Sequence, residues 1–185
     1  MEKIRFIIIT LPPEHIQTEI NNLRTPLCKQ SNSFQALTYP PHVTLRTGAI
    51  VPLEHITTYI QDFETLLAEQ KPFSIESGEI DYGSYFQNDI KKYYIFYKIN
   101  LSEELAALNK KLLTFKSYIK SNKTTFHPHL TLVFDDLEET RYKELVSRIE
   151  SNSIYLSKKF KWICNNVCLY HFSQSKWVPY HSFTF

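Results

Sequence analysis

The chain has 185 residues, 43% of them hydrophobic and 15% aromatic, which is enough to bury the core of one domain. Charged residues make up 22% and the formal net charge is +2. This composition argues against a disordered chain and against extended duplex binding, for which a larger basic excess is typical. A small nucleotide or a short single-stranded nucleic acid is compatible with it.

The sequence also bears on the cellular setting. No apolar run approaches membrane-spanning length, and no cleavage site follows the short apolar stretch 4–11. We therefore expect a cytoplasmic protein that does not bind a membrane. The cysteines Cys28, Cys164 and Cys168 are too few for a disulfide framework. We interpret the last two as small core residues in preference to a redox or metal pair.

The first half of the chain predicts the order strand, helix, strand, helix, strand. A strand covers 3–10, and prolines at 12 and 13 open a helix with apolar residues at helical spacing. A second strand over 42–47 is followed by a helix that starts at Pro52, and a strand over 73–82 closes this half. The polar stretch 83–91 is interpreted as a mobile hairpin loop.

The second half repeats this order. It predicts a strand over 93–99, a helix capped by Ser102 whose apolar stripe ends at Ile119, a strand over 129–134 and a helix over 138–150. Three final strands are expected over 154–160, 163–172 and 177–183.

The matching order suggests a duplicated unit. Ile4 and Tyr93 also lie at nearly equal offsets before His42 and His129. We therefore predict an α+β fold in which one domain over 1–185 has two lobes, with sequence halves at roughly 1–82 and 92–185. A pseudo-two-fold axis would relate the halves and leave a central cleft between two antiparallel sheets.

One short motif occurs once in each half. It is Pro-His-Val-Thr-Leu at 41–45 and Pro-His-Leu-Thr-Leu at 128–132. Strand side chains alternate between two faces, so the histidine and threonine of each motif share one face and the aliphatic residues point to the other. Halves that meet about a two-fold axis would bring all four polar side chains to one cleft. A single half-buried histidine needs no functional explanation, but a matched pair does.

These residue types suit cleavage of a phosphodiester. The reaction needs one group that takes a proton from the attacking oxygen and another that gives a proton to the leaving oxygen. An imidazole, with an ordinary pKa of about 6.5, performs either role at neutral pH. Threonine hydroxyls can hydrogen-bond the non-bridging phosphate oxygens. We therefore predict His42 and His129 as catalytic residues, and Thr44 and Thr131 as substrate-binding residues.

The two motifs resemble those of the 2H phosphoesterase superfamily, which includes bacterial 2′-5′ RNA ligase-like proteins, cyclic nucleotide phosphodiesterases and viral 2′,5′-oligoadenylate phosphodiesterases. That superfamily is defined by two His-x-Thr/Ser motifs, and both motifs of this chain match. The resemblance covers the whole chain in element order. It implies a two-lobed α+β fold with a central active site that needs no metal or other cofactor.

The resemblance also implies a reaction. The expected substrate is a nucleotide or short single-stranded RNA with a 2′,3′-cyclic phosphate or a 2′-5′ linkage. One histidine would activate water and the other would protonate the departing oxygen. We take His129 as the base and His42 as the acid, an assignment that the sequence does not settle.

Neighbouring residues are candidates for further substrate contacts. Arg46 shares the strand face of His42 if the strand stays regular, and it could then meet a phosphate oxygen; a structural or solvated arginine fits equally well. His127 shares the face of His129 and could line the cleft or lie at the surface. Aromatic side chains stack on the bases of single-stranded ligands. The candidates for stacking, all open to a simple packing role as well, are Tyr39, Tyr85, Phe126 and Tyr170.

Two other functions fit parts of the pattern. His127 and His129 could bind zinc together with His42 or His171, but no acidic or cysteine ligand lies near either motif and both threonines would be unexplained. A non-catalytic module that binds or sequesters RNA or a nucleotide would keep the cleft, but binding alone does not require two proton-transfer groups. We therefore expect a monomeric hydrolase without a metal, with the binding module as the alternative.

Overall fold

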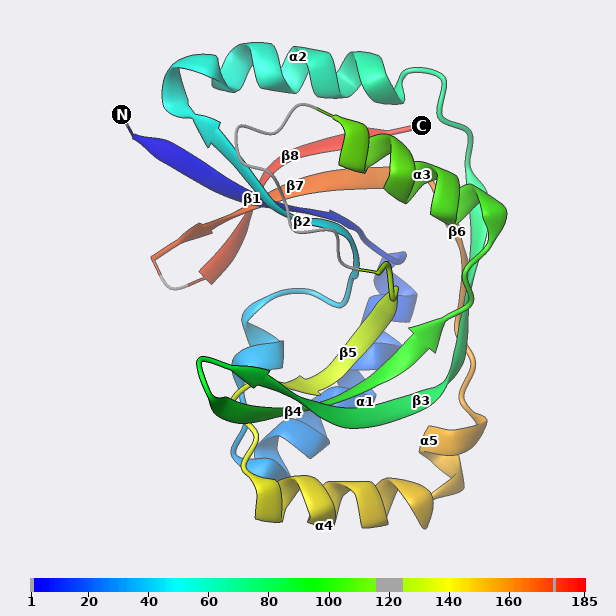
Figure 1. The fold of residues 1–185 in the computed structure, drawn as a ribbon. Helices are drawn as coiled ribbons and strands as arrows, with labels where there is room; N and C mark the ends of the chain where they lie inside the picture. Colours follow the sequence, from blue (N-terminus) through cyan, green and yellow to red (C-terminus); the bar gives the residue numbers. More distant parts are fainter. Residues whose placement is uncertain (1, 116–124, 175) are drawn as a thin grey trace.

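The structure is a computed structural model that describes residues 2–115, 125–174 and 176–185. Within these residues, eight strands are hydrogen-bonded in the order β6-β3-β4-β5-β2-β1-β7-β8 (Figure 1). The strands are β1 (Lys3–Thr10), β2 (Val43–Pro52), β3 (Phe73–Gln87), β4 (Ile90–Ile99), β5 (His129–Phe134), β6 (Lys161–Cys164), β7 (Asn166–Ser173) and β8 (Lys176–Thr184). The helices are α1 (Glu14–Ser31), α2 (Ile56–Leu67), α3 (Glu103–Thr114), α4 (Glu139–Glu150) and α5 (Ser153–Ser157), with the short 3₁₀ helices η1 (Gln35–Thr38) and η2 (Leu53–His55).

The strands form two groups of four that meet at β2 and β5. In the described residues these two strands share one register pair, Val43 with Leu130. We call β2-β1-β7-β8 with α2 and α3 the first lobe, and β6-β3-β4-β5 with α1, α4 and α5 the second lobe (Figure 1). The predicted α+β fold with antiparallel strands is confirmed. The strands follow one continuous order, however, where two separate sheets were expected.

Each lobe takes elements from both halves of the sequence. β3 pairs with β4 and β6 in the second lobe, and β7 and β8 complete the first lobe. The helices exchange in the same way, because α1 packs on β5 and α3 packs on β2. The sequence division at residues 82 and 92 therefore differs from the spatial division into lobes. A duplicated origin of the halves stays a prediction.

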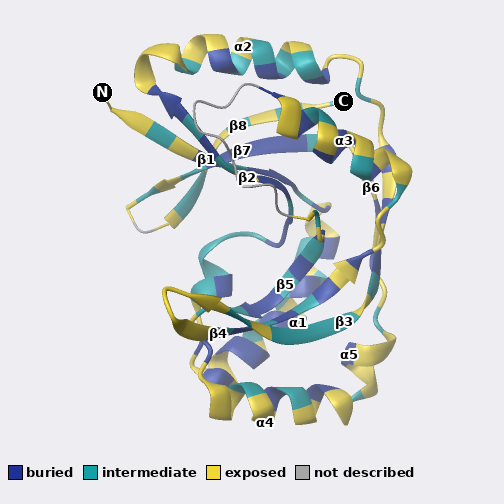
Figure 2. Cartoon of the chain, in the orientation of Figure 1, coloured by how far each residue is buried: buried dark blue, intermediate teal, exposed yellow. Residues whose placement is uncertain are grey.

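The core lies between the strands and the helices. Phe6 and Ile8 of β1 are fully buried, whereas exposed residues gather on the outer sides of α2 and α4 (Figure 2). In α3 the Ser102 hydroxyl accepts a hydrogen bond from the Leu105 amide, as the predicted cap requires, and Leu105 and Leu112 are buried. Each buried leucine contributes about 1.5–3 kcal/mol, more than a typical cap, so the apolar stripe is the main anchor of α3.

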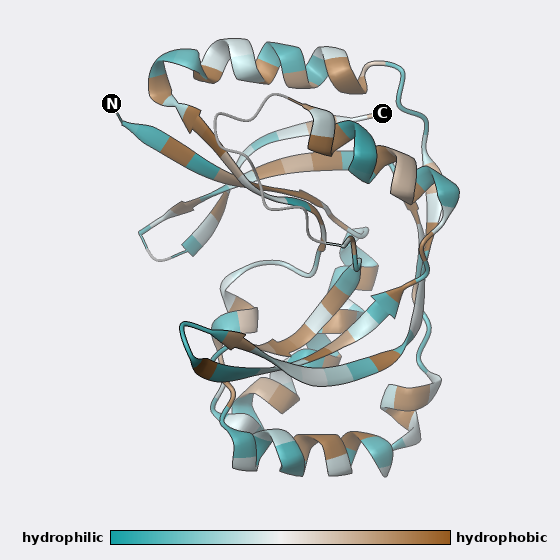
Figure 3. Ribbon diagram, in the orientation of Figure 1, coloured by the Kyte–Doolittle hydropathy of each residue, from teal (hydrophilic) through white to brown (hydrophobic). Residues whose placement is uncertain are grey.

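Hydropathy follows the same division. Figure 3 shows hydrophobic residues along the strands and a mixture of hydrophobic and hydrophilic residues around α2 and α4. This mixture is typical of helices with one face on the core and one in water. None of the described helices combines the length and the apolarity that crossing a membrane requires.

The predicted hairpin over 83–91 is present, but the stretch forms two paired strands where a loop was expected. β3 continues to Gln87 and β4 begins at Ile90, so a two-residue turn joins them. Both turn residues, Asn88 and Asp89, have positive φ angles of 49° and 63°. Asparagine and aspartate tolerate this left-handed conformation, and two such residues allow the tight turn that matches the twist of a strand pair. The polar sequence therefore extends two strands past the edge of the core.

The predicted strand over 154–160 is wrong, because residues 153–157 form the short helix α5. The Asn152 side chain accepts a hydrogen bond from the Ile154 amide and caps this helix. Tyr155 is buried, and its carbonyl accepts a hydrogen bond of 2.9 Å from the Tyr97 hydroxyl. A cap and one tertiary contact thus override an apolar pattern. The predicted stripe of α3 extended to Ile119, which lies outside the described residues.

Candidate active site

The two histidine motifs lie side by side on the central strands. Val43 and Leu130, the pair that joins β2 to β5, occupy the same position in their motifs. An antiparallel register therefore places His42 next to Thr131 and Thr44 next to His129. Val43 and Leu130 are fully buried, so the four polar side chains share the opposite face of the sheet. The sequence-predicted catalytic and phosphate-binding residues are brought together.

Both imidazoles are held in the same way. The Nδ1 atom of His42 lies 2.9 Å from the Pro40 carbonyl oxygen, and that of His129 lies 2.7 Å from the His127 carbonyl oxygen. A carbonyl oxygen only accepts, so each Nδ1 carries the proton. In its neutral form, each ring therefore presents an unprotonated Nε2. The local cause is the chain turn before each strand, which aims a backbone carbonyl at the ring two residues later.

Burial lowers the pKa of both imidazoles. His42 is 9% exposed, and burial lowers its pKa to about 4 against the effect of the hydrogen bond to Pro40. A charge on His129 lowers the pKa of His42 further, as expected for two imidazoles on neighbouring strands. Burial also lowers the pKa of His129. At neutral pH both imidazoles are therefore neutral in the absence of a bound anion.

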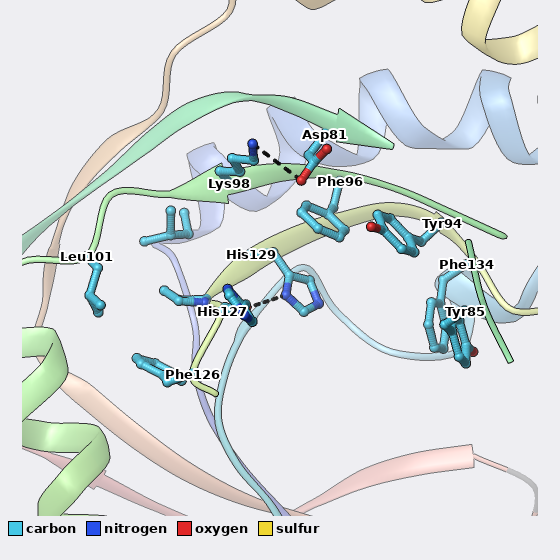
Figure 4. A pocket seen from close by; sticks show the side chains of 12 residues that line it. Asp81, Tyr85, Tyr94, Phe96, Lys98, Leu101, Phe126, His127, His129 and Phe134 are labelled. Carbon is cyan, nitrogen blue, oxygen red and sulfur yellow. Dashed lines mark hydrogen bonds and ion pairs between the residues drawn. The ribbon is translucent and has the colours of Figure 1, made fainter. Parts of the chain in front are cut away.

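Two cavities open beside His129. The larger one, of about 550 Å³, lies in the second lobe and is lined by β3, β4, β5 and the segment 126–128 (Figure 4). The smaller one, of about 240 Å³, has Thr44 and Asn109 in its wall. Phe126, His127 and His129 line both cavities. His129 thus stands where two spaces meet, an arrangement that suits a ligand with two parts joined at the histidine.

Aromatic rings form much of the larger cavity. The Phe96 ring stacks on the imidazole of His129 with centroids 4.5 Å apart, and Tyr94 stacks on Phe96 at 4.8 Å. Tyr85 stacks on Phe134 at 5.8 Å. Tyr85 was a candidate from the sequence, but Tyr94 and Phe96 were missed. Their period-two spacing was visible in the sequence, although only the pairing of β4 with β5 places them beside His129.

The loop before His42 brings Tyr39 to the site. The Tyr39 ring lies edge-on against His42, with centroids 4.9 Å apart. Arg24 of α1 donates a hydrogen bond of 2.9 Å to the Tyr39 carbonyl, and the Asp136 carboxylate accepts one of 2.7 Å from the Phe34 amide. Arg24 and Asp136 therefore fix the loop that carries His42. The sequence offers no signal for these contacts, since Asp136 lies far along the chain from the amides that it binds.

Arg46 does not share the strand face of Thr44, because β2 is irregular there. Thr44 pairs with Ile9 and Arg46 with Ile8, so two steps along β2 correspond to one step along β1. This bulge turns Arg46 to the face opposite Thr44. Its guanidinium donates hydrogen bonds to backbone carbonyl groups at the end of α3. The predicted phosphate contact of Arg46 required a regular strand, and β2 is not regular there. Arg46 does border the smaller cavity.

Two further sequence candidates lie away from the cavities described above. Tyr170 is 7% exposed and packs with Ile9 and Cys168 on the first lobe, and neither cavity includes it. His171, considered as a zinc ligand, packs against the ring of Tyr180 with centroids 5.4 Å apart. Among the residues that the structure describes, no three His, Cys, Asp or Glu side chains gather as a metal site.

Known proteins are similar to this chain in sequence and in fold. The family model of the 2′-5′ RNA ligase superfamily matches residues 12–176. A relative from Bacillus cytotoxicus, whose name places it provisionally among the phosphoesterases, is 25% identical over 178 residues, or 95% of this chain and 94% of that protein. The structure of E. coli LigT with 3′-AMP has a TM-score of 0.63 at 16% identity and covers 99% of this chain and 98% of its own. A protein of Thermus thermophilus has a TM-score of 0.60 at 12% identity, with 97% of each chain covered. The chain therefore belongs to the 2′-5′ RNA ligase superfamily, and so to the 2H phosphoesterases that its paired motifs resemble.

Proposed function

We propose that the protein is a phosphodiesterase that uses His42 and His129 for general acid–base catalysis, without a metal, on a 2′,3′-cyclic phosphate or a 2′-5′ linkage. The observation that carries the proposal is the matched anchoring of the two imidazoles. Each donates a hydrogen bond from Nδ1 to a backbone carbonyl, which leaves Nε2 available for a substrate. Two such groups on adjacent strands supply the two proton transfers that a phosphodiester needs.

A nucleotide or a short single-stranded RNA is the proposed substrate. Aromatic rings line the larger cavity beside His129, and such rings stack on bases. The E. coli protein of similar fold binds 3′-AMP, a ribonucleotide with a phosphate on the sugar. Thr44 and Thr131 lie next to the opposite histidines in the register and would donate hydrogen bonds to the non-bridging oxygens.

The proposed reaction on a cyclic phosphate is one displacement. A water oxygen forms a bond to phosphorus while the bond from phosphorus to one ribose oxygen breaks. One imidazole takes a proton from the water, and the other gives a proton to the departing ribose oxygen, which leaves as a hydroxyl. The product carries a phosphate monoester on the neighbouring ribose oxygen. The base ends the step charged and the acid ends it neutral, so solvent must exchange one proton with each.

The structure favours His42 as the base and His129 as the acid, the reverse of the working assignment from the sequence. A base must be neutral before the reaction, and the pKa of about 4 keeps His42 neutral. His129 borders two cavities, so a bound phosphate anion next to it favours its protonated form. The departing ribose oxygen would then lie on the side of the larger cavity.

The test is turnover of a panel of phosphodiesters, with products identified by mass spectrometry. The panel contains nucleoside 2′,3′-cyclic phosphates, 2′-5′ and 3′-5′ dinucleotides and a nucleoside 4-nitrophenyl phosphate. We expect hydrolysis of a cyclic or 2′-5′ substrate that persists after exhaustive chelation and that His42→Ala and His129→Ala each reduce by about 10²-fold or more. Wild-type protein that binds these compounds and returns them uncut would instead establish the non-catalytic binding module.

The nitrophenyl substrate separates the two roles. Nitrophenolate leaves without protonation, so loss of the acid should matter little for this substrate, whereas loss of the base should matter as much as before. We therefore expect His129→Ala to retain most of the nitrophenyl activity and His42→Ala to lose it. The opposite pattern would restore His129 as the base, and equal losses would show that neither residue acts as a dedicated acid.

A further inference from the structure

We propose that the larger cavity is a nucleobase subsite that selects guanine, with Asp81 and Lys98 as the residues that recognise the edge of the base. This inference rests on the proposed function, because it places the phosphorus of the substrate beside His129. The cavity has room for a nucleoside at about 550 Å³, and its wall runs from His129 to Asp81 and Lys98 (Figure 4).

The strand register sets the distance from the phosphate site to this ion pair. Thr131 pairs with Phe96, and Phe96 pairs with Asp81, so the three residues form one row across β5, β4 and β3. Adjacent strands are about 4.8 Å apart, so Asp81 lies about 10 Å from Thr131 across the sheet. A nucleotide spans a similar distance from its phosphorus to the far edge of its base. Phe96 lies in the middle of the row, where the edge of its ring would contact the base.

The floor of the cavity is a stack of rings, because Phe96 has the Tyr94 ring on one face and the His129 imidazole on the other. The Tyr94 and Phe96 rings are stacked with an angle of 14° between their planes. Gly83, the register partner of Tyr94, makes this possible, because a Cβ atom at that position would lie 2.5 Å from the Tyr94 hydroxyl oxygen. The Tyr94 ring therefore lies over the glycine, close to the sheet. Bases of any kind can pack against the apolar edges of these rings, so the floor provides affinity without choosing among the bases.

The choice among bases comes from the Asp81 carboxylate. A carboxylate offers about four acceptor positions. The Tyr82 amide donates to Oδ1 at 3.0 Å, and Lys98 Nζ lies 3.3 Å from Oδ2. Two acceptor positions are left next to a cationic donor, and the side chains of Asp81 and Lys98 are 36% and 56% exposed. Guanine fits this pattern, because its Watson–Crick edge has two neighbouring N–H donors beside a carbonyl oxygen, whereas each other base offers the carboxylate one donor there.

The first lobe has no counterpart to this row. The residue that corresponds to Thr131 is Thr44, which pairs with Ile9, and Ile9 pairs with Cys168. The positions of Phe96 and Asp81 in the second lobe are thus occupied in the first lobe by the aliphatic side chain of Ile9 and the buried thiol of Cys168. The recognised guanosine therefore belongs on the side of His129, and the smaller cavity takes the part of the substrate beyond the phosphate.

The experiment measures kcat/KM for the four common nucleoside 2′,3′-cyclic phosphates. We expect the wild type to prefer the guanosine compound by at least about fivefold, the lower range for a bidentate base contact. Asp81→Asn, which replaces one acceptor oxygen by a donor, should remove the preference. Glu76→Gln is the matched control, since Glu76 also lies on β3 and pairs with a lysine but does not line the cavity. A preference for another base, or a guanine preference that Asp81→Asn leaves intact, would overturn the proposal.

Binding of the 3′-nucleotides by calorimetry separates this inference from the proposed function. Preferential binding of 3′-GMP over 3′-UMP that Asp81→Asn abolishes would support the subsite, even if no cyclic phosphate were cut. Hydrolysis of all four cyclic phosphates at equal rates, with equal binding of the products, would keep the phosphodiesterase and refute the guanine subsite.

Discussion

Replacing Arg46 by methionine should destabilise the fold and leave the chemistry unchanged. Arg46 is 4% exposed, and its Nη1 atom donates hydrogen bonds to the carbonyl oxygens of Leu112 and Phe115. A hydrogen bond from a charged group contributes about 1.5–3 kcal/mol, so two contribute about 3–6 kcal/mol. Methionine restores part of the apolar volume and removes a buried charge, which offsets some of that loss. We expect the free energy of unfolding to fall by about 2–4 kcal/mol.

Urea unfolding followed by tryptophan fluorescence measures this loss. Arg5→Met is the matched control, because Arg5 lies exposed on β1 and its replacement should change the free energy of unfolding by less than about 0.5 kcal/mol. The kcat and KM of folded Arg46→Met protein for a nucleoside 2′,3′-cyclic phosphate, which has no group beyond the phosphate to occupy the smaller cavity, should equal those of the wild type. A variant with unchanged stability and a raised KM that depends on salt would refute the structural role and show that Arg46 binds the phosphate.

Three further predictions follow from the site. First, kcat/KM should be highest between about pH 4 and 6.5 and should fall on both sides. The reason is that the proposed base His42 has a pKa of about 4 and that the pKa of the proposed acid His129 lies below 6.5. A rate profile with its maximum above pH 7 would contradict this. Second, the unfolded chain binds a proton at residue 42 below about pH 6.5 and the folded chain only below about 4. The free energy of unfolding, compared with that of His42→Gln, should therefore drop by up to about 3 kcal/mol as the pH falls through this window, and a constant difference would exclude the shift. Third, Asp136→Ala should lower the free energy of unfolding by about 1–2 kcal/mol, because the amides of Phe34 and Gln35 lose their acceptor, and Asp136→Asn should recover part of the loss in the same urea titration.

The sequence predicts the elements with strong local signals. β1 and β5 have the expected bounds, since prolines soon follow the first apolar run and two aspartates follow the second. The start of α3 follows from Ser102, whose hydroxyl makes the predicted cap contact. Within each motif, the shared face of the histidine and the threonine follows from strand alternation alone. Each of these features depends on residues within a few positions of one another.

Features that depend on distant residues could not be predicted. The bulge that turns Arg46 away from Thr44 arises in the pairing of β2 with β1, and nothing in the sequence of β2 marks it. The packing of α1 on β5 and of α3 on β2 exchanges helices between the sequence halves. The cavity beside His129 exists because β4 lies next to β5, so Tyr94 and Phe96 gain their role from a neighbour that the sequence does not identify.

The two histidines are alike in their backbone contacts, yet a displacement at phosphorus has a direction. Identical anchoring gives both rings the same tautomer and makes either one able to accept or donate a proton at Nε2. The difference must come from the surroundings. His42 is the more deeply buried ring and is held neutral, whereas His129 opens on both cavities and stacks on Phe96. In the proposed mechanism, the matched strands position the two imidazoles, and the different walls of the two lobes determine which oxygen leaves phosphorus.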